Sequence, residues 1–167
     1  SAPMLEIRPV SGPSVKARID AIESYAKIIF ISRNAVSYGL AELANHHRRF
    51  TTQQLFAVGP GTAKALQDGG FGPVSMPVDE FSSAGLLRLD ALQDSQVAGA
   101  KILIFRGSGG RELLSETLTS RGAEVDYCEV YERAVPQLSL ARTLLAAHVR
   151  TPAVAVVTSL DILNNLA

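Results

Sequence analysis

The stretch that decides the fold is Lys101–Pro136, KILIFRGSGGRELLSETLTSRGAEVDYCEVYERAVP. It opens with the apolar run Ile102–Phe105, which is short and therefore predicts a strand buried on both faces. The glycine-rich segment Gly107–Gly110 follows and interrupts that run with flexible backbone. The sequence thus predicts a buried strand that ends in a loop able to approach a ligand closely.

An amphipathic helix is predicted directly after this loop. Its apolar face contains Leu113, Leu114, Thr117 and Leu118, at the spacing of one side of a helix. Gly122 lies where a helix-ending residue with positive φ is expected, and residues 125–130 read as the next strand. Strand–loop–helix–strand units of this kind build parallel sheets, whose functional groups lie at the carboxyl ends of the strands.

The rest of the chain repeats this alternation of strands and helices. It predicts an α/β fold, a three-layer domain with a mostly parallel sheet. Ser14 and Ser82–Ser83 are expected to cap helices at their N-termini. Further strands are expected at 4–10, 27–32, 55–58, 74–76 and 154–158, and further helices at 14–24, 33–46, 63–67, 83–92, 140–149 and from 159 onward.

Composition limits the classes of function. The formal net charge of the 167 residues is zero, so no overall field attracts nucleic acid. The single cysteine, Cys128, excludes a disulfide within the chain and favours a reducing compartment. His46, His47 and His148 offer no metal-ligand spacing, and no apolar run is long enough to span a membrane. With no secretory signal visible, we expect a cytoplasmic domain without a metal.

Four strand-to-helix turns are rich in glycine or hydroxyl residues and would share one edge of a parallel sheet. Free backbone N–H groups at helix N-termini make such turns natural anion sites. Arg33, Arg106 and Arg111 flank two of the turns and could pair with carboxylates. The alternative is that the turns are only helix caps and tight loops. The candidate binding residues are Ser32, Arg33, Asn34, Gly59, Thr62, Arg106, Gly107, Ser108, Gly110, Thr158 and Ser159.

Several segments together carry a family resemblance. They are IFISRNAV at 29–36, VGPGTAKAL at 58–66, SRGAEV at 120–125 and VYER at 130–133. In this order and spacing, the chain resembles the uroporphyrinogen-III synthase family. The resemblance implies two similar α/β domains joined by two crossing strands, one domain being built from both ends of the chain. A weak internal repeat between the regions 5–34 and 128–161 agrees with two related domains.

The resemblance also implies a division of this chain. Residues 11–131 would form the complete domain, whereas 1–10 and 132–167 would supply the crossover strands and part of the split domain. The family pattern has further segments before Met4 and after Ala167 that this sequence does not contain. We therefore expect the chain by itself to have little synthase activity.

The activity implied by the resemblance is a cyclisation without a cofactor. Hydroxymethylbilane, a linear tetrapyrrole with many carboxylates, loses its terminal hydroxyl as water and closes with its last pyrrole ring inverted. The enzyme would be a hydro-lyase, monomeric at full length. Tyr131 lies where the family has a substrate-facing tyrosine, so it is the candidate proton donor. Alternatively, Tyr131 is a residue packed at a strand end with its hydroxyl in water.

The residues by themselves are also compatible with two other functions. The first is nucleotide binding, because the segment Gly107–Gly110 follows a strand as in a dinucleotide fingerprint. The third glycine of that fingerprint would fall at Glu112, so the match is incomplete. The second is a regulatory module without a ligand, because a fold does not fix a function.

Overall fold

The computed structural model describes residues 6–46 and 50–134. The chain divides into two units, one of residues 9–132 and the other of the two chain ends, 1–8 and 133–167. The first unit contains all the candidate site residues that the structure describes. The elements expected at 140–149, at 154–158 and after Ser159, together with the candidate residues Thr158 and Ser159, lie outside the described residues.

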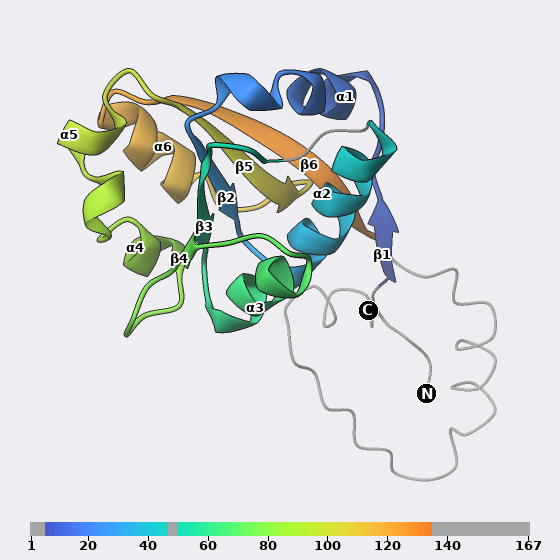
Figure 1. The fold of residues 1–167 in the computed structure, drawn as a ribbon, viewed down its shortest axis with the longest axis horizontal. Helices are drawn as coiled ribbons and strands as arrows, with labels where there is room; N and C mark the ends of the chain where they lie inside the picture. Colours follow the sequence, from blue (N-terminus) through green and yellow to red (C-terminus); the bar gives the residue numbers. More distant parts are fainter. Residues whose placement is uncertain (1–5, 47–49, 135–167) are drawn as a thin grey trace, which may run out of the picture. The chain divides into compact units, whose positions relative to one another are not determined.

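The sheet has six strands in the order β1-β6-β5-β2-β3-β4. The pairs β2–β3, β2–β5, β3–β4 and β5–β6 are all parallel. This confirms the α/β fold with a mostly parallel sheet that the sequence predicts (Figure 1). The strands are β1 (Glu6–Pro9), β2 (Lys27–Phe30), β3 (Gln54–Ala57), β4 (Val74–Ser75), β5 (Lys101–Gly107) and β6 (Glu124–Ala134).

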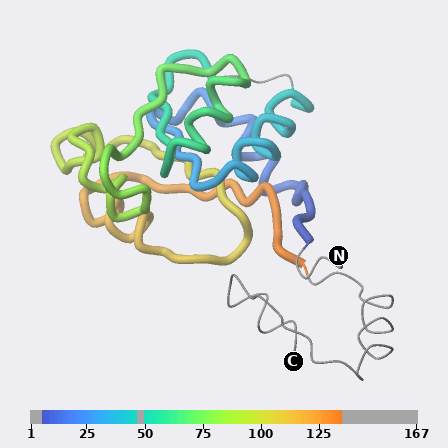
Figure 2. The backbone as a smooth tube through the Cα atoms, turned by 90° about the horizontal axis from the view of Figure 1, so that it is seen from below, coloured from blue at the N-terminus to red at the C-terminus, as the bar shows by residue number. Residues whose placement is uncertain are grey.

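Helices form two separate groups beside the sheet (Figure 1, Figure 2). In the first group α2 packs against α1 and α3, and in the second α4 packs against α6. The helices are α1 (Pro13–Asp20), α2 (Arg33–Asn45), α3 (Pro60–Asp68), α4 (Ser83–Leu86), α5 (Asp94–Val97) and α6 (Leu113–Ser120), with 3₁₀ turns at Ile22–Ser24 and Asp90–Leu92.

Alternating side chains of the central strands fill both faces of the sheet. Ile29, Phe56 and Ile104 lie in one buried cluster with Leu86 of α4 and Leu118 of α6. Because these three strand residues are register partners, they stand side by side on one face. Successive residues point to opposite faces, so Phe30 and Phe105 belong to the other.

Gly39 of α2 lets that helix lie close to the second face. The rings of Phe30 and Phe105 stack there with centroids 4.7 Å apart. A Cβ atom on Gly39 would come within 2.7 Å of Cδ1 of Phe105 and 3.2 Å of the Phe30 ring. The glycine is therefore required by the space between helix and sheet, and it sets the position of α2.

Two helices begin earlier than the sequence predicts, and α1 also ends earlier, at Asp20, with a 3₁₀ turn over Ile22–Ser24. Helix α1 begins at Pro13 after Gly12, and Ser14 does not cap it. Proline is favoured in the first turn of a helix because it has no N–H to leave unpaired. Helix α3 likewise begins at Pro60, ahead of the expected start at Ala63.

The helix expected from Ser82–Ser83 to Leu92 is wrong in its length. Ser82 does cap α4, accepting a hydrogen bond from the N–H of Gly85 at 3.1 Å, but α4 ends at Leu86. Side chains take the carbonyls that a longer helix would use: Gln93 donates to Leu87 O at 2.9 Å, and Arg121 donates to the same oxygen at 2.8 Å. A 3₁₀ turn and α5 replace the rest of the expected helix.

Replacement of Gly39 by valine tests the close packing of α2. Gly39→Val should destabilise the fold by about 1–3 kcal/mol, because the added methyl groups overpack the stacked rings. Gly39→Ala should cost less, since alanine recovers up to about 1 kcal/mol of helix propensity. Urea unfolding measures both, with Gly72→Ala as the control because a Cβ there would meet nothing within 4 Å. A Gly39→Val protein as stable as the original would contradict this packing argument.

Candidate active site at the carboxyl ends of the strands

The turns that follow β2, β3 and β5 lie at one edge of the sheet. Phe30 is the register partner of both Ala57 and Phe105 in parallel pairings, so β2 and β3 end level with each other and β5 continues for two more residues in the same direction. The turns at Ser32, Gly59 and Gly107 therefore come together, as the sequence predicts. Tyr131 joins them, because it is the register partner of Gly107 across β5 and β6.

Ser32 and Tyr131 form the centre of this group. Their hydroxyl oxygens lie 3.1 Å apart, and either can donate the hydrogen bond between them. Ser32 is also the N-cap of α2, accepting a hydrogen bond from the N–H of Ala35 at 3.0 Å. The positive end of this helix thus acts on Ser32 and, through it, on the tyrosine hydroxyl.

The absence of a side chain at Gly107 leaves the space that the ring of Tyr131 occupies. A Cβ on Gly107 would come within 2.5 Å of Cε2 and 2.6 Å of Cζ of the tyrosine. The N–H of Ser108 donates to Tyr131 O at 2.8 Å, and the ring of Tyr38 lies 6.0 Å away, centroid to centroid. Tyr131 is only 3% exposed. Its hydroxyl bonds to Ser32 rather than only to water, unlike the alternative considered from the sequence.

The Gly59 turn lies between a cationic and an aromatic side chain. A Cβ on Gly61 would be 3.6 Å from Cδ of Arg33, so that arginine extends over the turn. On Gly59, a Cβ would meet Cβ of Phe81 at 3.1 Å. Arg33 makes no ion pair with another residue of the described ranges, which leaves its guanidinium available to an anion.

Arg106 instead has partners within the chain. Its side chain is 3% exposed, and its NH1 donates to Glu112 Oε1 at 3.1 Å. Nε donates to Gly107 O at 3.2 Å and lies 3.9 Å from Oε1 of Glu129, while the guanidinium stacks 4.3 Å from the centre of the Tyr127 ring. The structure thus directs Arg106 at its own loop, which it fastens to the body of the domain.

Glu112 completes this fastening. It accepts a hydrogen bond from the Tyr127 hydroxyl at 2.6 Å. That bond, assisted by the charge of Arg106, lowers the pKa of Glu112, whereas burial and then the bond to Glu112 raise the pKa of Tyr127. Glu112 also precedes α6 as its N-cap residue, the position where a dinucleotide fingerprint needs its third glycine. The loop is therefore closed by side chains of this domain.

The remaining candidate residues are divided between surface and interior. Asn34, Ser108 and Gly110 are exposed, whereas Thr62 is 7% exposed and its N–H donates to Gly59 O at 3.1 Å. Tyr38 and Phe81 also lie beside these residues, although the sequence does not single them out. Only the helical spacing of Tyr38 from Asn34, four positions earlier, could have indicated that it faces the same edge.

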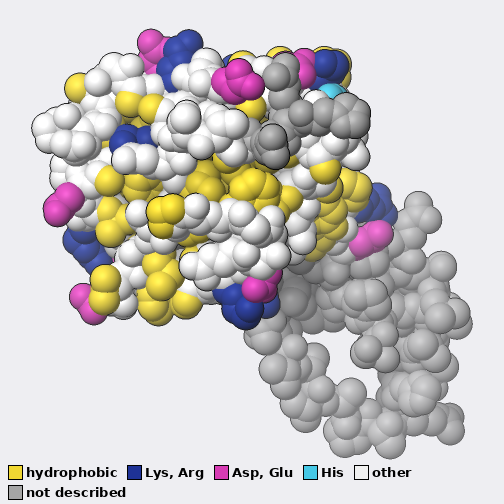
Figure 3. All heavy atoms as spheres, in the orientation of Figure 1, with side chains coloured by type: hydrophobic (Ala, Val, Ile, Leu, Met, Phe, Trp, Pro, Cys, Tyr) yellow, Lys and Arg dark blue, Asp and Glu magenta, His cyan; other side chains and the backbone are white. Residues whose placement is uncertain are grey.

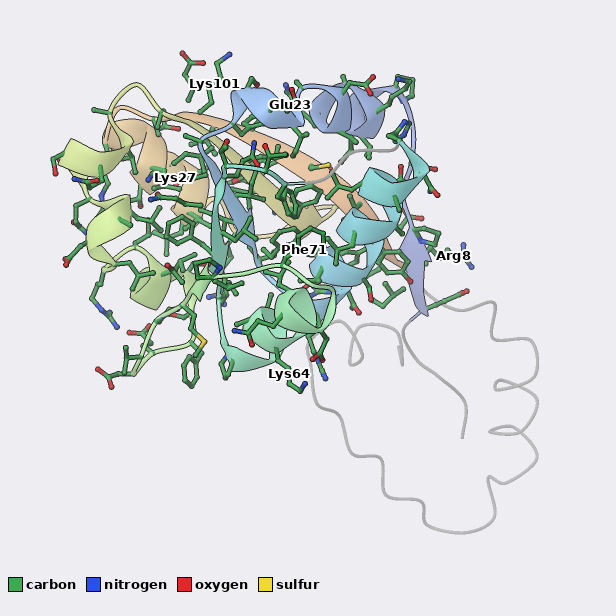
Figure 4. All side chains as sticks on the ribbon, in the orientation of Figure 1. Arg8, Glu23, Lys27, Lys64, Phe71 and Lys101 are labelled. Carbon is green, nitrogen blue, oxygen red and sulfur yellow. The ribbon has the colours of Figure 1, made fainter. Side chains whose placement is uncertain are left out.

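Other features of the described residues are separate from this group of candidate residues. A cavity of about 450 Å³ is lined by residues 50–56, which include most of β3, by the 70–73 loop, where Phe71 is labelled in Figure 4, and by Ser75 and Ala91; none of the candidate residues lines it. Within 6–46 and 50–134, no cluster of His, Cys, Asp and Glu could hold a metal ion. The same ranges contain no helix long and apolar enough to cross a membrane. Cys128 is buried and free, and burial raises its pKa to about 12.

A double-mutant cycle tests the contact between Gly107 and Tyr131. Gly107→Ala should cost about 1–3 kcal/mol of unfolding free energy by forcing the tyrosine ring aside. In a Tyr131→Ala background the same change should cost less, with a coupling of about 0.5–3 kcal/mol. Gly61→Ala is the matched control, because its Cβ would make only an ordinary contact with Arg33. Additive free energies for Gly107→Ala and Tyr131→Ala would show that the glycine does not position the ring.

Comparison with solved structures agrees on the fold. The wild-type uroporphyrinogen III synthase of Thermus thermophilus superposes with a TM-score of 0.61 at 18% identity, over 86% of this chain and 57% of that one. The corresponding enzyme of Helicobacter pylori 26695 gives a TM-score of 0.53 at 20% identity, over 83% of this chain and 57% of that one. The chain thus spans little more than half of these proteins.

Sequence comparison is more specific. The chain is 36% identical over 170 residues to the uroporphyrinogen-III synthase of Salmonella typhimurium, covering 99% of this chain and 68% of the relative. It is 34% identical over 166 residues to the uroporphyrinogen-III synthase of Escherichia coli K12, covering 98% of this chain and 67% of that relative. The model of the family described as uroporphyrinogen-III synthase HemD matches residues 1–167. With the expected motifs in place, the chain belongs to the uroporphyrinogen-III synthase family.

Proposed function

We propose that the protein containing this chain cyclises hydroxymethylbilane to uroporphyrinogen III with loss of water. Family membership supports the activity. The observation that carries the proposal is the hydroxyl pair of Ser32 and Tyr131, 3.1 Å apart at the edge where three strand-to-helix turns meet. The described residues contain nothing that favours the nucleotide-binding or regulatory alternatives, since Glu112 closes the glycine-rich loop.

Carboxylates of the substrate would bind at the helix N-termini of this edge. In α2, the N–H groups of Arg33 and Asn34 have no acceptor within the helix, and in α3 the same holds for Gly61. A helix end contributes about 0.3–1 kcal/mol toward a negative charge, and a hydrogen bond to a charged group about 1.5–3 kcal/mol. Several such contacts, together with the guanidinium of Arg33, are needed to hold a polycarboxylate. Ser108, Gly110 and Thr62 belong to the same proposed contact set.

The chemical step would need one proton at the leaving oxygen. The pyrrole nitrogen supplies the electron pair that expels the hydroxyl, the C–O bond breaks, and the oxygen leaves as water with a proton from Tyr131. The freed methylene carbon then bonds to the carbon of the last pyrrole ring that already carries a methylene bridge, and the bond from that ring carbon to its bridge breaks. The released bridge carbon bonds to the other, unsubstituted carbon next to the ring nitrogen, which closes the macrocycle with the ring inverted, and the proton lost from that carbon returns to the tyrosine. No net proton or electron is left over.

Ser32 would stabilise the intermediate phenolate of Tyr131. When Ser32 donates its hydroxyl hydrogen to the tyrosine oxygen, its own oxygen still accepts the N–H of Ala35. The N-terminus of α2 then stabilises the negative charge on the Tyr131 oxygen through two successive hydrogen bonds. Since Tyr131 is only 3% exposed, its contact with the substrate would be confined to the hydroxyl end, beside the half-buried Ser32.

The proposal includes the setting of the enzyme. It is a lyase that uses no cofactor, acts on a small molecule rather than nucleic acid, and works as a monomer in the cytoplasm. The buried, unpaired Cys128 agrees with a reducing compartment, where a free thiol persists.

Substitution of Tyr131 tests the proton donor. In the complete gene product that contains this chain, Tyr131→Phe should lower turnover of hydroxymethylbilane about 100-fold, the lower end of what a positioned acid contributes, because the substrate helps to expel its own hydroxyl. Affinity for uroporphyrinogen III should stay largely intact, since the ring remains. Tyr25→Phe is the matched control: it removes a hydroxyl that donates to Asp126 at 2.8 Å, away from this edge. Unchanged turnover of Tyr131→Phe would remove the tyrosine from the mechanism.

A further inference from the structure

The largest exposed hydrophobic side chains of the described residues lie at the edge that carries the candidate site. They are Met76, Val78, Phe81 and Leu113, which are 38%, 82%, 52% and 46% exposed. Leu113, expected on the apolar face of its helix, is instead the first residue of α6, directly after the Gly107 loop. We call Met76, Val78 and Phe81 the apolar rim.

The apolar rim lies on the loop that leaves β4. Because β4 pairs parallel with β3, this loop begins at the same edge as the Gly59 turn. Phe81 reaches that turn, since its Cβ would be 3.1 Å from a Cβ on Gly59. Figure 3 shows hydrophobic side chains at the surface over this loop, in the lower left of the view, and the loop itself runs from β4 to α4 in Figure 1.

Polar contacts hold the loop so that its apolar side chains point outward. The Glu80 carboxylate accepts a hydrogen bond from Ser82 Oγ and pairs with Arg88 at 2.7 Å, and these bonds lower its pKa. The backbone is equally constrained, because a Cβ on Gly85 would lie 1.8 Å from Glu80 O. Pro77 is buried. The exposure of Val78 and Phe81 is therefore imposed by a fastened loop rather than left by a loose one.

We infer that Val78 and Phe81 contact the pyrrole rings of the tetrapyrrole while the neighbouring Gly59 turn and Arg33 hold its carboxylates. The inference rests on the proposed function. A linear tetrapyrrole has flat apolar rings and a charged periphery, so its site needs apolar surface next to anion-binding groups. Arg33 over Gly61 and Phe81 against Gly59 supply the two kinds of surface on one turn. Aromatic rings stack on such planar groups, and exposed apolar patches of this kind mark ligand or partner sites.

The test uses the complete gene product that contains this chain. Phe81→Ser and Val78→Ser should each raise KM for hydroxymethylbilane and Kd for uroporphyrinogen III about 3- to 10-fold, with a smaller effect on kcat. Phe81→Leu, which keeps the apolar surface, should change both constants less than Phe81→Ser. Lys101→Ser is the control. Lys101 is half-exposed and begins β5, so it lies at the amino end of the strand, away from the edge that carries the apolar rim. Figure 4 shows it at the opposite end of the view from Lys64 of α3. Thermal unfolding should change little in all four variants, since the replaced side chains are exposed.

The possible outcomes separate the inference from the proposed function. If the unchanged protein cyclises hydroxymethylbilane but the serine variants keep its KM and Kd, the inference is overturned and the proposed function stands. If these variants alter sedimentation without altering KM, the apolar rim is a contact between copies of the protein, and the inference is again overturned. If the unchanged protein does not cyclise hydroxymethylbilane or bind uroporphyrinogen III, the proposed function fails and the inference fails with it.

Discussion

Parallel pairing of β2 with β3 and β5 is the constraint on which the rest of this domain depends. With Phe30 in register with both Ala57 and Phe105, the three strands end at the same edge of the sheet, and each must continue into a helix that returns along the sheet. The helix N-termini are thereby gathered at one edge, together with their unpaired N–H groups. A surface rich in hydrogen-bond donors follows from the topology alone, before any side chain is considered.

Glycines then determine how closely the parts of this edge approach. Gly39 admits α2 to the rings of Phe30 and Phe105, Gly107 admits the ring of Tyr131, and Gly59 admits Phe81. None of these glycines has a positive φ; a Cβ on Gly39 or Gly107 would collide with an aromatic ring, whereas a Cβ on Gly59 would only make a tight contact with Phe81. The requirement is different at Gly110, whose φ of +128° suits glycine and where a Cβ would also meet Arg106 NH2 at 2.6 Å.

The sequence predicts the features of this domain that depend on neighbouring residues. The helix expected at 33–46 after a buried strand is α2, and in the structure Ser32 caps it. The fold class and the shared edge follow from the alternation of strands and helices. Features that depend on distant partners could not be predicted: α4 stops at Leu86 because Gln93 and Arg121 take carbonyl oxygens, and Arg121 comes from another helix end.

The two arginines beside the site illustrate the same limit in chemical terms. Arg33 and Arg106 have the same charge and each adjoins a strand-to-helix turn, so the sequence makes them equivalent candidates for a carboxylate. Arg106 lies on a strand and is 3% exposed, where an unpaired charge would be very costly, and it is therefore matched by Glu112 and Glu129. Arg33 lies on the exposed first turn of α2, where water can solvate it without a partner. Burial thus assigns Arg106 to shaping the loop and leaves Arg33 as the cation able to meet a ligand.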